Sequence, residues 1–113
     1  MTMLPILEDF ARACNSNARL RQMNRDWSRT IVIRTTDKGE SYWLRSENGS
    51  IRSGEGPVPD VDLQVEGGEE IIRAVFSGEM SPTEPYNAGD LLVKGRQDDL
   101  MRLDIITLLI WGE

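Results

Sequence analysis

The side chains best suited to acid–base chemistry in this sequence are two pairs of neighbouring carboxylates, Glu69/Glu70 and Asp98/Asp99. Each pair opens an amphipathic segment, where free backbone amides and the helix dipole favour acidic residues. A catalytic carboxylate also needs a second group held near it in a cleft, and no sequence pattern brings one there. We therefore interpret both pairs as helix starts and predict no catalytic residue.

The sequence contains no histidine and a single cysteine, Cys14. This composition excludes a histidine-based catalytic triad, a histidine-containing zinc site and an intramolecular disulfide. The 19 acidic residues could still supply oxygen ligands, but they do not form the regular acidic loop of a calcium hand. We predict no metal site and no cofactor, and we expect Cys14 to be a buried apolar side chain.

The net charge of −6 argues against nucleic acid as a partner, because neutralisation of phosphates supplies most of the affinity of nucleic-acid binding. The arginines are concentrated in residues 1–36. Such a segment can touch an acidic membrane transiently, or it can simply be the solvated face of a helix. Both readings remain open from the sequence.

The 113 residues, of which 39% are hydrophobic and 28% are charged, fit one globular domain over residues 1–113 with one core. No apolar run reaches the ~18 residues of a membrane-spanning helix. The first residues carry the acidic pair Glu8 and Asp9 where a signal peptide would be basic and then apolar. We expect a cytoplasmic protein.

The first half of the chain predicts two short helices followed by an antiparallel meander. Helical spacing over residues 5–14 is followed by capping side chains at residues 15–17, so a second helix is expected to begin near Ala18. Residues 30–36 and 42–44 have strand composition. The Asn48-Gly49 pair then predicts a tight hairpin into a third strand, because both residues tolerate positive φ.

The second half predicts two more strands and two more helices. Residues 61–66 alternate apolar and polar side chains, as a strand with one buried face does. Residues 69–76 predict a helix that ends at Gly78. A loop or single helical turn at 81–87 leads to a strand at 91–93 and a final helix at 97–111, which loses its polar face from Ile105 onward.

The three tryptophans could contribute to a ligand-binding site, although large aromatic side chains usually fill a core. Trp43 lies on the strand face opposite to Tyr42 and Leu44, so either Trp43 or that pair must face water. Trp27 stands at the boundary between helix and strand, and its role is left open. Trp111 is expected to be a lid or interface residue.

In their order and spacing, these elements resemble the sterol carrier protein 2 family over nearly the whole chain. The resemblance is carried by the segments 15–17, 42–49, 59–63, 76–82 and 89–95, followed by the leucine-rich final helix. It implies an α+β fold, with a five-stranded mixed, mainly antiparallel sheet and helices packed on one face. It also implies an apolar tunnel for a fatty acid, acyl conjugate, sterol-like molecule or quinone precursor, and no catalytic residue.

From this resemblance we expect the protein to bind, shield or transfer a lipid or another apolar small molecule. The expected lining residues are Trp43, Phe76, Met80, Leu92, Leu100, Leu103, Ile106 and Ile110. A second hypothesis stays open, in which the apolar final helix is a protein interaction surface, for instance in a homodimer, and no physiological ligand exists.

Overall fold

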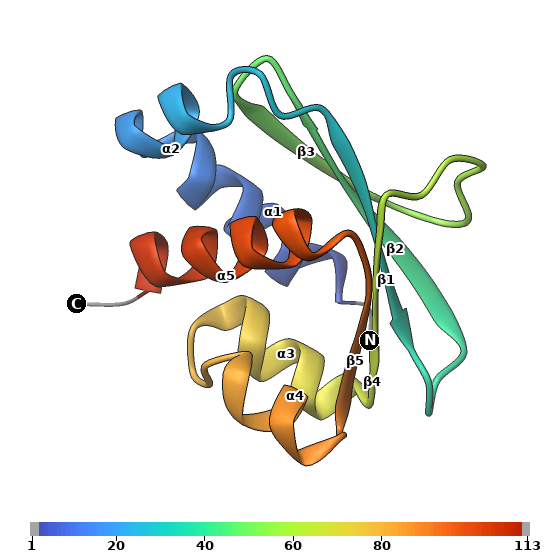
Figure 1. The fold of residues 1–113 in the computed structure, drawn as a ribbon. Helices are drawn as coiled ribbons and strands as arrows, with labels where there is room; N and C mark the ends of the chain where they lie inside the picture. Colours follow the sequence, from blue (N-terminus) through green and yellow to red (C-terminus); the bar gives the residue numbers. More distant parts are fainter. Residues whose placement is uncertain (1–2, 112–113) are drawn as a thin grey trace.

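The computed structural model describes residues 3–111. In chain order the elements are α1 (Leu4–Asn15), α2 (Ala18–Met23), β1 (Arg29–Thr35), β2 (Glu40–Glu47), β3 (Ser50–Glu55), β4 (Leu63–Gly67), α3 (Glu69–Ser77), α4 (Thr83–Ala88), β5 (Leu91–Gly95) and α5 (Gln97–Trp111). Figure 1 shows the helices gathered on one side of a twisted sheet. The expected α+β architecture with helices on one face of the sheet is confirmed.

The strands form a five-stranded sheet in the order β3-β2-β1-β4-β5. Only β1 and β4 pair in parallel, and the other neighbours are antiparallel. The β2–β3 hairpin turns at Asn48 and Gly49 with φ values of 53° and 82°, as its sequence predicts. The sheet is therefore mixed and mainly antiparallel, which confirms the expected topology and places β5 at an edge.

The helix boundaries follow local capping chemistry. Asn17 accepts a hydrogen bond of 3.1 Å from the backbone N–H of Leu20 and so caps α2. Gly78 ends α3 in the left-handed conformation, which glycine adopts without a steric penalty. The first amide of α3, that of Glu69, donates to the Asp37 carboxylate, so the cap of this helix comes from the β1–β2 turn.

The core lies between the sheet and α1, α3 and α5. Alternate residues of β1 and β4, such as Ile33 and Leu63, are fully buried beneath the helices. Phe10 of α1 meets Phe76 of α3 edge to face, with the ring centroids 5.1 Å apart. Side chains therefore fill the middle of the layer between sheet and helices, and free space is displaced toward the β5 edge.

The final helix is attached to the start of β1 by a polar cluster. The buried carboxylate of Asp99 accepts hydrogen bonds from the indole N–H of Trp27 and from the guanidinium of Arg29. The Arg102 guanidinium lies 5.4 Å from the centroid of the Trp27 ring. Asp98 and Asp99 lie in the first turn of α5, as predicted. The Asp99 side chain in addition bonds to residues far away in the sequence, which the sequence did not indicate.

Candidate functional site

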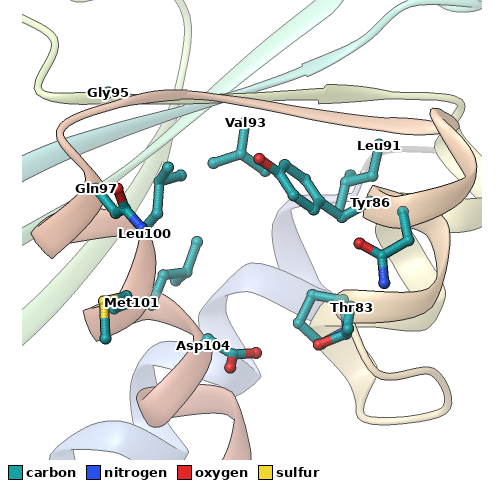
Figure 2. A pocket seen from close by; sticks show the side chains of 12 residues that line it. Thr83, Tyr86, Leu91, Val93, Gly95, Gln97, Leu100, Met101 and Asp104 are labelled. Atoms are coloured by element: carbon teal, nitrogen blue, oxygen red, sulfur yellow. The ribbon is translucent and has the colours of Figure 1, made fainter.

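A cleft of about 600 Å³ lies between β5, α4 and α5. Figure 2 shows its side chains converging on one space beneath β5. The cleft is lined by Pro82, Thr83, Tyr86, Asn87, Leu91, Val93, Gly95, Gln97, Leu100, Met101, Leu103 and Asp104. Its volume lies within the range of roughly 300–1,000 Å³ that is typical of small-molecule sites.

The strand β5 supplies the roof of the cleft through its alternating side chains. Leu91, Val93 and Gly95 face the helices, because successive side chains of a strand point to opposite faces. The intervening Leu92 and Lys94 stand opposite Glu66 and Gln64 of β4 in the strand register. One face of this edge strand therefore contributes apolar surface to the cleft, and the other face lies on the outer side of the sheet.

The two helices form the walls. Leu100 and Leu103 lie one helical turn apart on α5 and both reach the cleft. From α4, the Tyr86 ring points into the space toward Val93 in Figure 2. Tyr86 and Met101 are 48% and 56% exposed, so the mouth of the cleft is open to solvent between these two side chains.

A smaller hollow of about 180 Å³ continues along α5. It is lined by Gly78, Met80, Ser81, Pro82, Asp104, Thr107 and Leu108. Pro82 and Asp104 line both spaces. The two spaces together form one groove between α5 and the segment from the end of α3 through α4, and the Asp104 side chain stands at their junction.

Three of the eight residues predicted to line a ligand site border this groove. Leu100 and Leu103 line the main cleft, and Met80 lines the smaller hollow. The helical spacing of the two leucines and the position of Met80 just after α3 account for their placement.

Three further predicted residues belong to the core instead. Phe76 and Ile106 are each 1% exposed and are part of the central apolar cluster. Ile110 is partly buried and packs against that cluster. Close-packed interiors leave no room for a ligand among such side chains, and none of the three is among the residues that line the groove.

Trp43 and Leu92 need correction as lining residues, because both lie on the outer face of the sheet. Tyr42 and Leu44 are buried on the helix side, so Trp43 points the other way, where its ring lies against Gly54 of β3. Leu92 is 50% exposed. Period-two alternation on β2 and β5 therefore separates both residues from the cleft.

Sequence reasoning missed most of the wall residues. The sequence predicts a loop or a single helical turn at 81–87. The structure places the short helix α4 there, and Pro82, Thr83, Tyr86 and Asn87 line the cleft. The sequence of β5 does contain a signal that shows which of its residues face the cleft. Lys94 shares the strand face of Leu92, and a lysine on that face indicates water there, which assigns Leu91 and Val93 to the covered face.

Other reactive groups give no competing site within residues 3–111. Burial raises the pKa of the Cys14 thiol to about 12, so the expectation of a buried, apolar cysteine is confirmed. In this part of the chain, no group of three or more acidic or cysteine side chains is placed to bind a metal ion. None of the helices described here has the length and apolar character needed to cross a membrane.

Comparison with known proteins agrees with this architecture. The sequence model of the SCP-2 sterol transfer family matches residues 7–106. No curated protein matches the chain by sequence. Among solved structures, the UbiJ-SCP2 ubiquinone synthesis protein superposes with a TM-score of 0.75 at 13% identity, over 92% of this chain and 91% of that chain.

Two further structures show the range of proteins that share the fold. The palmitated SCP2L2 from Aedes aegypti has a TM-score of 0.73 at 16% identity, with 95% of each chain covered. The sec-alkylsulfatase Pisa1 from Pseudomonas sp. has a TM-score of 0.64 at 14% identity, over 80% of this chain but only 14% of that one. The same fold therefore occurs as nearly a whole chain and as a small part of an enzyme.

Proposed function

This chain belongs to the SCP-2 sterol transfer family, and we propose that it binds an apolar, lipid-like ligand in the groove between β5, α4 and α5. The observation that carries the proposal is the apolar cleft of about 600 Å³ bordered by Leu91, Val93, Leu100 and Leu103. The proposal assigns binding, shielding or transfer of the ligand to these residues and no catalytic step to any residue.

The driving force is the removal of apolar surface from water, worth roughly 25 cal/mol per Å². The rim adds a few polar groups, including Gln97, Asn87 and Thr83, which suit a ligand with one polar end. Fatty acids, acyl conjugates, sterol-like molecules and quinone precursors all have this form. The related SCP2L2 structure is that of a palmitated protein, and the UbiJ-SCP2 protein is named for ubiquinone synthesis.

The open mouth of the cleft bears on how the ligand is held. Tyr86 and Met101 are about half exposed at opposite walls. Full burial of a long chain, as in the tunnel that the family resemblance implies, therefore requires these two side chains to fold over the ligand. We expect loose selectivity for chain shape, because Met101 and Met80 have flexible, polarizable side chains.

Saturable binding is the direct test. We expect long-chain ligands to displace a neutral fluorescent lipid from the protein with one-site stoichiometry, and native mass spectrometry of the same sample to show a lipid adduct. Absence of saturable binding by fatty acids, acyl conjugates, sterols and neutral single-chain lipids alike would overturn the proposal.

A second function has its own observation. Met101, Ile105 and Leu108 follow one another at helical spacing on α5 and are 56%, 40% and 63% exposed. Such a stripe suits an interface with another copy of the chain. Light scattering separates the two functions, because a dimer that buries α5 and binds no lipid would favour the interface.

A further inference from the structure

We propose that the groove selects ligands whose polar end is neutral or cationic and disfavours ligands with an anionic end, such as free fatty acids. This inference rests on the proposed binding function. It assigns selectivity to Asp104, which borders both the cleft and the adjoining hollow.

Among the described residues that line the two spaces, Asp104 is the one that carries a charge. Figure 2 shows its carboxylate at the edge of the cleft, reaching from α5 toward the side of Thr83. Within residues 3–111 its side chain takes part in none of the ion pairs or hydrogen bonds, whereas its backbone carbonyl accepts a hydrogen bond from the Thr107 hydroxyl. A negative charge without a counter-charge therefore faces the groove.

Nearby basic residues point elsewhere. Arg102, two residues before Asp104, donates to the Met23 carbonyl and to Asn24 Oδ1 on the far side of α5. Lys94 lies on the outer face of β5, opposite Gln64. Arg96 is exposed and lies between the lining residues Gly95 and Gln97. None of these three cations is among the residues that line the groove, and none forms an ion pair with Asp104 within residues 3–111.

The physical consequence depends on the sign of the ligand charge. The Asp104 side chain is exposed, so solvent screens its charge in part. A carboxylate end placed near Asp104 is still repelled by it, and an ammonium end is attracted. The neutral rim groups Gln97, Asn87 and Thr83 can hydrogen-bond a hydroxyl or carbonyl without a charge penalty.

The test compares three amphiphiles that share a twelve-carbon chain: dodecanoate, 1-dodecanol and dodecyltrimethylammonium, each below its aggregation concentration. Titration calorimetry at low salt should give weaker binding of dodecanoate than of the other two. Asp104→Asn should raise the affinity for dodecanoate and lower the affinity for dodecyltrimethylammonium by about fivefold each, as expected for one partly screened charge pair. The affinity for dodecanol should stay unchanged.

The matched control is Asp98→Asn, which removes the same charge from the same helix at a residue outside the groove lining. It should leave the order of the three affinities unchanged, which separates a local effect of Asp104 from the net charge of −6. In the unmodified protein, ~0.5 M salt should also reduce the difference in affinity between dodecanoate and dodecyltrimethylammonium, because salt screens charges.

Each failure has its own signature. If none of the three amphiphiles binds, this inference is overturned, and the proposed function is overturned with it when acyl conjugates and sterols also fail to bind. If the three bind equally, or if Asp104→Asn and Asp98→Asn shift the affinities alike, the selectivity inference is overturned while the binding function stands.

Discussion

The indole N–H of Trp27 donates a hydrogen bond of 2.9 Å to the carboxylate of Asp99, which lies 72 residues later in the chain. Arg29 donates to both oxygens of the same carboxylate at 3.0 and 3.1 Å. This contact fixes the first turn of α5 against the start of β1. The next residues of α5 carry Leu100 and Leu103 into the cleft, so the contact also sets the position of one cleft wall.

Asp99→Ala should destabilise the protein by about 1–3 kcal/mol, because it leaves a buried indole N–H and a partly buried guanidinium without their acceptor. In a domain of this size the melting temperature should fall by several degrees. Asp98→Ala, the exposed neighbour, should change stability by no more than about 0.5 kcal/mol. Equal melting temperatures for the two variants would contradict the anchoring role.

Ile106→Trp tests the boundary between core and cleft. Ile106 is 1% exposed in the core cluster, so an indole there should destabilise the protein by at least about 1–3 kcal/mol through overpacking. Ile106→Ala should cost about 2–5 kcal/mol through the cavity it leaves. An Ile106→Trp variant with an unchanged or raised melting temperature would mean that this side chain faces free space instead.

Cys14 should be inert in the folded protein. Burial raises the pKa of its thiol from 9.0 to about 12, so a thiol reagent at pH 8 should label it only when denaturant unfolds the chain. Because the pKa is raised only in the folded protein, the unfolded chain loses the thiol proton at a lower pH than the folded protein does. The stability of the natural protein relative to Cys14→Ala should therefore be constant below about pH 9 and decline as pH rises toward 12.

Gly54→Ala should displace the Trp43 ring, since a methyl group at this position would overlap the indole. We expect a change in tryptophan emission that is absent when Gly54→Ala is made in a Trp43→Phe background. Gly68→Ala is the control, because its φ of −65° suits alanine and a methyl group there meets only Asp37 Oδ2, at 3.8 Å. Emission that is insensitive to Gly54→Ala would contradict the placement of Trp43 on the outer face.

Local sequence patterns predicted the fold well because the elements follow short-range rules. The Asn48-Gly49 turn, the Asn17 cap and the Gly78 helix end each need only a few neighbouring residues, and each occurs as expected. The alternation of Leu63 and Val65 with polar residues likewise identifies β4 and its buried face. The family resemblance implied the five-stranded mixed sheet with helices on one face, which the structure confirms.

The site was harder to predict because it depends on which face of each element meets which neighbour. By residue type alone, Leu91 and Leu92 are equally suitable as lining residues. Only the strand register shows which of the two faces the cleft. Tyr86 and Asp104 enter the groove because α4 and α5 meet across β5, a relationship between segments that no local pattern contains. The hydrogen bond between Trp27 and Asp99 could not be predicted from the sequence for the same reason.

The most direct test of the binding groove compares tryptophan at two adjacent positions of β5. Val93 faces the cleft, whereas Leu92 lies on the opposite face of the same strand and is 50% exposed. In titrations with a neutral fluorescent single-chain lipid, Val93→Trp should weaken binding by about tenfold or more by filling the cleft, while Leu92→Trp should stay within about twofold of the natural protein. Equal affinities for the two folded variants would contradict a ligand site between β5, α4 and α5.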